Sequence, residues 1–345
     1  MLRQNKRPRM IAIKPAIIRR VLCAVGLCVI AAVCAALPPQ AKAREAVTYL
    51  LPAGATQPAF APWILAKQLG YYADAGYDVS FQTAGGGVDV ARQIDAGTVD
   101  IGGGLGDTPV IVRGQGVKVK AIAVLGGGSL TVIVAGAGRG IQTMRDLRGK
   151  HLMVLSFADT TYHVLLGALA GAGLRKNDLD IEAATPETIV RRVVSGAADA
   201  CACVPDWQVE ISNAQPGATI IPTDDIPDMA QAILASDRAI AAKPDMLRAM
   251  VGATLRGMRF ITADPAKAAD AYVQAVPRWQ GKQALLTQVF HAYIDLAYRG
   301  QPVPGRIDVG RLDALQAVYL QQGFIKKAVP VADLYANGFV PAAAP

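Results

Sequence analysis

The sequence predicts an α/β protein with two lobes of similar build. In the stretch 81–108, a strand, a glycine turn, a helix, a second strand and a second glycine turn follow one another. The pattern recurs 99 positions later, where Gly97 is matched by Gly196 and Asp107 by Asp206. The last part of the chain is helical and poor in strands. Glycine and apolar positions that agree at one spacing favour two lobes, and a helical tail is expected to pack back on the first lobe.

The stretch 81–108 indicates a parallel βαβ unit. Apolar residues up to Ile94 recur at helical spacing, and Gly97 stands where a helix commonly ends. The glycine turns 85–87 and 102–104 then follow the carboxyl ends of neighbouring strands, where open α/β sheets bind ligands. The alternative is that these glycines only allow tight turns.

Alternation, helical spacing and turn residues predict the remaining elements. The expected strands are 46–51, 78–83, 119–125, 130–134, 151–155, 200–204, 219–221 and 232–235. The expected helices are 62–69, 160–172, 187–194, 244–261, 265–275, 283–297 and 309–322. We expect a discontinuous first lobe, 44–135 plus 239–345, and a second lobe, 136–238, with hinges near 135–139 and 236–239.

The first 43 residues predict a signal peptide for export. They contain eight lysines and arginines and no acid, an apolar run at 21–37, and the small-x-small sequence Ala41-Lys42-Ala43. The alternative is a membrane anchor, for which the run is short. The other 27 cations equal the 27 acids, so the net charge of +8 comes from this segment. The mature chain is neutral and implies no nucleic-acid partner.

Neither a metal site, a cofactor site nor a catalytic centre is indicated. The three histidines, His151, His163 and His291, have no metal-ligand spacing to a cysteine or carboxylate. Neither glycine turn completes a phosphate-loop or dinucleotide motif. Beyond the first 43 residues the cysteines are Cys201 and Cys203, which we expect to be buried thiols because residues two apart on a strand make a strained bridge.

The sequence instead offers groups that bind a small ligand. Helix N-termini favour anions because their N–H groups are unsatisfied and the helix dipole is positive there. Aromatic residues near strand and helix ends can line a pocket, although core packing explains each equally well. Asp107 and Asp206 either cap helices or accept hydrogen bonds from the ligand. The expected ligand-binding residues are Phe60, Ala61, Gly86, Gly87, Asp107, Thr108, Phe157, Thr160, Thr161, Tyr162, Asp206 and Trp207.

Three stretches resemble a known family. They are 62–72 with 76–79, the strand entry Gly97-Thr98-Val99-Asp100-Ile101-Gly102, and 140–150, in which an isoleucine, an aspartate-leucine pair and a glycine-lysine pair keep their spacing. These residues are similar to the nitrate/sulfonate/taurine group of solute-binding proteins that serve ABC importers. The family also includes a thiamine-precursor branch, whose cysteine-rich motif this sequence lacks.

The resemblance implies the two-lobed periplasmic-binding-protein fold of type II, with the ligand cleft between the lobes. We therefore expect a monomeric periplasmic solute-binding protein that captures a small organic anion, either a sulfonate or an aromatic or other carboxylate. It would deliver this ligand to an ABC permease and its ATPase. Where many members carry a Glu-Pro pair, this chain has Pro205-Asp206, which leaves the ligand class open. The alternatives are an exported enzyme using Asp107 or Asp206, and a ligand-presenting sensor.

Overall fold

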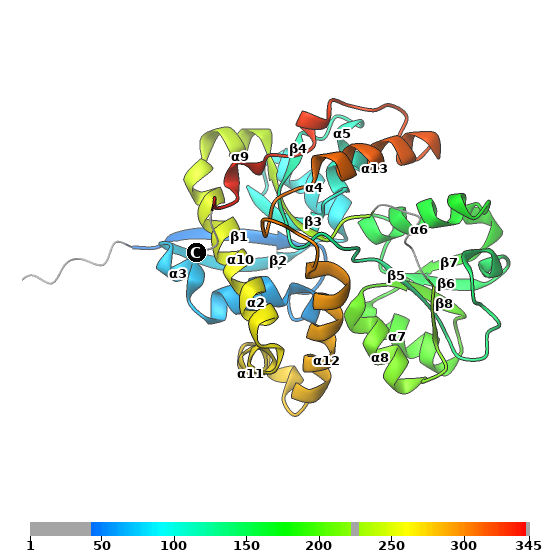
Figure 1. Ribbon diagram of the computed structural model, residues 1–345. Coiled ribbons are helices and arrows are strands. Elements are labelled where there is room, and N and C mark those ends of the chain that lie inside the picture. The colour runs from blue at the N-terminus through cyan, green and yellow to red at the C-terminus, as the bar shows by residue number, and fades with distance from the viewer. Residues whose placement is uncertain (1–42, 222–227, 343–345) are drawn as a thin grey trace, which may run out of the picture. The chain divides into compact units, whose positions relative to one another are not determined.

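The computed structural model describes residues 43–221 and 228–342. The expected signal peptide, apart from Ala43, lies outside these residues. Among the helices in the described ranges, none has both the length and the apolar character needed to span a bilayer. Two five-stranded sheets form the framework (Figure 1), so the predicted two-lobed α/β fold is confirmed.

The first sheet has the strand order β2-β1-β3-β10-β4. Strand β1 runs parallel to β2 and β3, whereas β10 runs antiparallel to β3 and β4. The strands are β1 (Glu45–Leu51), β2 (Tyr77–Thr83), β3 (Ile101–Leu105), β4 (Val119–Val124) and β10 (Gln231–Ser236). Strand β3 is buried along its whole length, since it lies between β1 and β10.

The second sheet has the strand order β7-β6-β8-β5-β9. Strand β6 runs parallel to β7 and β8, and β5 runs antiparallel to β8 and β9. The strands are β5 (Val132–Ala135), β6 (His151–Val154), β7 (Asp180–Ala183), β8 (Ala200–Cys203) and β9 (Thr219–Ile221). The sequence prediction missed β7, a short strand whose residues are exposed or half-buried.

The crossings between the sheets differ from the expected hinges. Strand β5 belongs to the second sheet and β10 to the first, so the chain changes lobe between β4 and β5 and between β9 and β10. The boundaries expected at 135/136 and 238/239 would place both strands in the other lobe. Hydrogen-bonded pairing decides lobe membership, and a single apolar strand does not reveal its partner.

Helices cover both sheets, and the helical tail packs on the first lobe through α10, which lies against α2. In the first lobe and tail they are α2 (Ala61–Gln68), α3 (Tyr71–Asp74), α4 (Gly87–Ala96), α5 (Thr108–Arg113), α9 (Asp237–Ala242), α10 (Pro244–Ala263), α11 (Pro265–Ala275), α12 (Gln283–Tyr293) and α13 (Val309–Gln321). In the second lobe they are α6 (Thr160–Gly171), α7 (Pro186–Ser195) and α8 (Pro205–Ala214).

The internal echo predicted from the sequence is confirmed. Helix α7 starts and ends 99 positions after α4, and β8 starts 99 positions after β3. Both helices end at a glycine in the left-handed conformation, Gly97 with a φ of 84° and Gly196 with a φ of 77°. A residue without a Cβ adopts this conformation at little cost, which explains why both positions are glycine.

Candidate functional site

A pocket lies where the carboxyl ends of the first lobe's strands face the second lobe. Its empty volume, including the open mouth, is about 580 Å³. Both lobes contribute to it. The lining residues are Pro52, Ala53, Gln57, Ala59, Phe60, Trp63, Gly87, Gly103, Gly104, Leu105, Leu130, Leu155, Asp159, Thr160, Thr161, Val204, Trp207 and Gln231.

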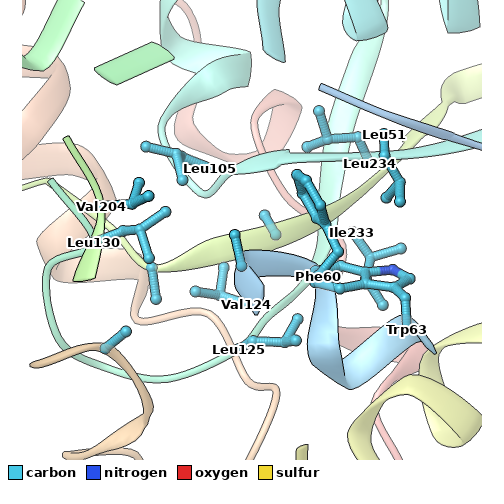
Figure 2. Packing of buried hydrophobic residues seen from close by; sticks show 14 of the residues in the cluster. Leu51, Phe60, Trp63, Leu105, Val124, Leu125, Leu130, Val204, Ile233 and Leu234 are labelled. Carbon is cyan, nitrogen blue, oxygen red and sulfur yellow. The ribbon is translucent and has the colours of Figure 1, made fainter. Parts of the chain in front are cut away.

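The walls of the pocket are mainly aromatic and aliphatic. Phe60 and Trp63 meet edge to face, with ring centroids 6.1 Å apart, and both are buried. Figure 2 shows these two rings side by side, and Leu130 next to Val204. Trp207, in the first turn of α8, adds a third aromatic side chain from the second lobe. Such walls suit a planar apolar ring.

The polar groups of the pocket lie mainly at the N-terminus of α6. Asp159 is the N-cap, and its Oδ1 accepts a hydrogen bond of 3.0 Å from the backbone N–H of Thr161. Burial raises the pKa of Asp159, while the side chain and N–H of Thr161 and the N–H groups of Gly87 and Thr160 oppose this shift. Gly87 is the first residue of α4 in the other lobe. The Asp159 carboxylate therefore caps α6, and the residue lies against the start of α4, since a Cβ on Gly86 would be 2.7 Å from Asp159 Cα.

Hydrogen bonds join the two lobes beside this carboxylate. The N–H of Val88 donates to the carbonyl oxygen of Ala158 over 3.0 Å. The hydroxyl of Ser156 donates to the carbonyl of Gly85. In the described structure the lobes are thus in direct contact around the pocket.

Five of the expected ligand-binding residues line the pocket: Phe60, Gly87, Thr160, Thr161 and Trp207. Three others lie directly behind it. Ala61 begins α2 beneath Phe60, Gly86 precedes Gly87 and abuts Ala158, and the hydroxyl of Thr108 contacts that of Thr160 over 2.9 Å. These residues shape the pocket without lining it.

The structure does not bring Phe157 and Tyr162 into this pocket. Their rings meet edge to face, with centroids 5.2 Å apart, and they line a separate hollow with residues near β7. Phe157 is 54% exposed, the largest exposure among the bulky apolar side chains of the described residues. The sequence placed them near a helix start but could not show that their side chains line this other hollow.

Asp107 and Asp206 do not line the pocket either, and Asp107, the N-cap of α5, makes no capping hydrogen bond with its side chain. Each is buried and accepts a hydrogen bond from a tyrosine of the tail: Tyr319 lies 2.7 Å from Asp107 Oδ2, and Tyr293 lies 2.8 Å from Asp206 Oδ1. Burial raises the pKa of both carboxyls to about 7, and the tyrosine hydrogen bonds partly oppose this.

A second hollow continues from the pocket. It shares Gln57 and Trp207 with the pocket, has an empty volume of about 520 Å³ and includes Asp206. Its lining carries both signs of charge, including Glu187 and Arg278, whose Oε1 and guanidinium nitrogen lie 3.5 Å apart. This hollow is more polar than the first pocket.

Sequence reasoning missed several lining residues, among them Trp63, Gln57 and Gln231. Gln231 lies in β10, and its side-chain N–H donates to the carbonyl of Ala59. Its Oε1 is buried and has no hydrogen-bond partner among the described residues. A glutamine that begins an apolar strand is a signal that could have identified this position.

The lining offers binding groups and little catalytic chemistry. Asp159 is its single ionisable residue, and the lining contains no histidine, cysteine, lysine or arginine. Within the described ranges no cluster of three metal-ligating side chains occurs. Cys201 and Cys203 are free, buried thiols in β8, as predicted. The arrangement can hold an apolar ring and exchange hydrogen bonds with its edges.

Comparisons with known proteins agree with this fold. A riboflavin-binding protein, RibY of Chloroflexus aurantiacus, is 24% identical over 297 residues, covering 82% of each chain. The structure of the alkanesulfonate-binding protein SsuA from Xanthomonas axonopodis pv. citri, bound to MOPS, has a TM-score of 0.67 at 18% identity. It covers 85% of this chain and 98% of that chain. The desulfurization enzyme DSZB, in complex with biphenyl-2-sulfinic acid, has a TM-score of 0.56 at 13% identity, covering 86% and 98%.

The family model described as NMT1/THI5 like matches residues 57–268, more than half of the chain. All the residues that line the pocket lie in this range, except Pro52 and Ala53. It also contains the three stretches on which the resemblance to the nitrate/sulfonate/taurine group depended. The chain therefore belongs to the NMT1/THI5-like family.

Proposed function

We propose that the protein is an extracytoplasmic solute receptor that binds a small organic compound between its lobes and delivers it to an ABC permease and its ATPase. The family membership and the two-lobed fold support a solute-binding role. The observation that carries the proposal is the aromatic pocket, whose lining comes from both lobes. Closing the lobes around a ligand would bury it, and the closed form would be the one that docks on the permease.

The ligand would have an apolar ring and a polar part. Phe60, Trp63 and Trp207 suit a ring, and the polar hollow beyond Gln57 suits hydroxyl or amide groups. RibY, a relative that is described as riboflavin-binding, sets a precedent for a ring with a hydroxylated tail. The organic anion expected from the sequence is the part of the expectation that the first pocket supports least, because no cation lines it; the cations Arg278 and Lys282 lie in the second hollow, together with Glu187 and Glu210.

The test is ligand recovery from protein purified after expression in rich medium. Native mass spectrometry should detect a bound small molecule, and adding it back to stripped protein should change tryptophan fluorescence, since Trp63 and Trp207 line the pocket. Small-angle X-ray scattering should show a smaller radius of gyration with the ligand than without it. A tightly bound ligand that leaves both fluorescence and radius unchanged would contradict the proposal.

The rival function is an enzyme, since the desulfurization enzyme DSZB shares the fold. The lining of this pocket favours the receptor, because its one ionisable side chain, Asp159, already accepts hydrogen bonds from the start of α6. Recovery of the bound compound unchanged after prolonged incubation supports binding alone. Conversion of the compound to a product would establish the enzyme.

A further inference from the structure

We propose that Asp159 is a specificity-determining residue that occupies the anion position between the lobes and makes the receptor select uncharged, hydrogen-bond-donating ring compounds. This inference rests on the proposed receptor function and names its ligand class. It goes against the organic anion expected from the sequence.

Two helix N-termini from opposite lobes face the pocket. Helices α4 and α6 both begin at it, at Gly87 and Thr160. Helix starts bind anions through free N–H groups and the helix dipole, so these two ends from opposite lobes would form a natural anion site. The sequence alone leads to that expectation for Gly86, Gly87, Thr160 and Thr161.

The carboxylate of Asp159 already fills the anion site that the starts of α4 and α6 would form. Asp159 Oδ1 accepts from the N–H and from the hydroxyl of Thr161. The start of α4 lies against the same residue, since a Cβ on Gly86 would be 2.7 Å from Asp159 Cα, and the N–H groups of Gly87 and Thr160 oppose the rise that burial causes in the carboxyl pKa. The side chain is only 6% exposed. A ligand sulfonate or carboxylate would therefore meet occupied donors and a like charge.

The pocket has no cation in its lining and has one buried acceptor without a partner among the described residues. The lining contains no lysine, arginine or histidine that could pair with a ligand anion, and in the adjoining hollow the cations Arg278 and Lys282 are matched by Glu187 and Glu210. Gln231 Oε1 is a buried acceptor without a partner among the described residues. A ligand that donates a hydrogen bond to this oxygen would satisfy it, whereas an anion would add another acceptor. Both features favour an uncharged ring with an N–H or O–H group.

The test uses pairs of probes of similar shape and different charge: nicotinamide with nicotinate, and benzenesulfonamide with benzenesulfonate. Isothermal titration of the wild-type protein should give the uncharged member of each pair at least tenfold tighter binding. Tighter binding of the anion would overturn the inference and leave the receptor function intact. Chemical conversion of a recovered natural ligand would instead overturn the receptor function.

Two variants test the position itself. Asp159→Gly removes the carboxylate, and glycine is tolerated at an N-cap; Asp159→Asn keeps the shape and the cap and removes the charge. We expect Asp159→Gly to bind benzenesulfonate saturably, with an affinity at least tenfold higher than that of wild type. Asp159→Asn should show a smaller increase in this affinity. Circular dichroism checks that both variants fold.

The two Asp159 variants test the role of this residue even if wild-type protein binds none of the four probes. Absence of any benzenesulfonate gain in both folded variants would overturn the role of Asp159. Wild-type protein that binds benzenesulfonate as tightly as Asp159→Gly does would overturn it as well. The control is Asp270→Asn, since Asp270 is exposed and lies outside the pocket, and its affinities should equal those of wild type.

Discussion

The hydroxyl oxygens of Thr108 and Thr160 lie 2.9 Å apart, although the two residues are 52 positions apart and belong to different lobes. Thr108 opens α5 and also accepts a hydrogen bond from the N–H of Leu105 over 3.0 Å. Thr160 opens α6 beside Asp159. This pair locates the seam along which the lobes meet, at the inner edge of the pocket.

Gly86 is the residue at this seam that tolerates substitution least. Its φ is 132°, and a Cβ there would lie 2.6 Å from the carbonyl oxygen of Ala158 in the other lobe. We predict that Gly86→Ala keeps the lobes apart and weakens ligand binding at least tenfold, or about 1.4 kcal/mol. Small-angle X-ray scattering should show a larger radius of gyration than for wild type.

Gly85→Ala is the matched control for this variant, because a Cβ at Gly85 would meet only Asp89 Oδ2 at 3.5 Å, an ordinary contact. Its radius should equal that of wild type. If Gly86→Ala and Gly85→Ala scatter alike, the close approach at Gly86 does not control how the lobes meet.

Asp206 makes stability depend on pH. Burial raises its pKa to about 7, against about 4 in an unfolded chain. The folded state then binds more protons than the unfolded state between these values. The contribution of this group to the free energy of unfolding is therefore complete below about pH 4 and is lost as the pH rises through about 7.

We predict that Asp206→Asn flattens the fall in the free energy of unfolding between pH 4.5 and pH 7.5. One group changes this free energy by at most about 1.4 kcal/mol per pH unit. Urea unfolding at several pH values measures the difference from wild type. The exposed Asp270→Asn should keep the wild-type slope; an unchanged slope in Asp206→Asn would show that the buried carboxyl does not titrate as described.

Arg311 holds both crossings between the lobes. Its guanidinium group, on α13, donates to the carbonyl oxygen of Gly127 in the first crossing and to that of Asp228 in the second. Asp228 Oδ2 in turn accepts from the N–H of Thr131 over 3.1 Å, which joins the crossings to each other. The tail thus fixes the segments about which the lobes would move.

We predict that Arg311→Met lowers the free energy of unfolding by about 1.5–3 kcal/mol, because buried carbonyls lose a charged donor while the apolar stem is kept. Arg306→Met is the control, since Arg306 is exposed, and should change stability by less than about 0.5 kcal/mol. Urea unfolding compares them. Equal effects of the two variants would exclude a special role for Arg311.

The thiols of Cys201 and Cys203 should be inert in the folded protein. Both are fully buried in β8, and burial is the main cause that raises the pKa of Cys203 well above its usual value. Since the thiolate is the reactive form, iodoacetamide should modify neither residue in native protein and both in guanidinium chloride. Peptide mass mapping identifies the sites, and native-state modification of either cysteine would contradict the buried placement.

Much of the fold could be predicted because its signals are local. Helix α4 was predicted from apolar spacing and from Gly97, and its counterpart α7 from the same pattern 99 positions later. The strands that were missed or assigned to the other lobe are those whose identity depends on a partner. Strand β7 is half-exposed at a sheet edge, and β5 and β10 pair across the expected lobe boundaries.

The pocket was predicted less completely than the fold. Phe60, Gly87, Thr160, Thr161 and Trp207 line it because strand and helix ends converge there, as topology requires. Phe157 and Tyr162 lie beside the same helix start but face another hollow. Position along the chain shows which end of a lobe a residue occupies, and only packing shows which way its side chain points.

The sequence by itself determined the α/β class, the duplication, the glycine turns and the family resemblance, since these depend on periodicity and on residues a few positions apart. Only the tertiary structure decided which lobe each crossing strand joins, that Asp107 and Asp206 bind tyrosines of the tail, and that Asp159 caps α6 beside the start of α4. These depend on contacts between distant segments, whose geometry is set by how the lobes pack and not by local spacing.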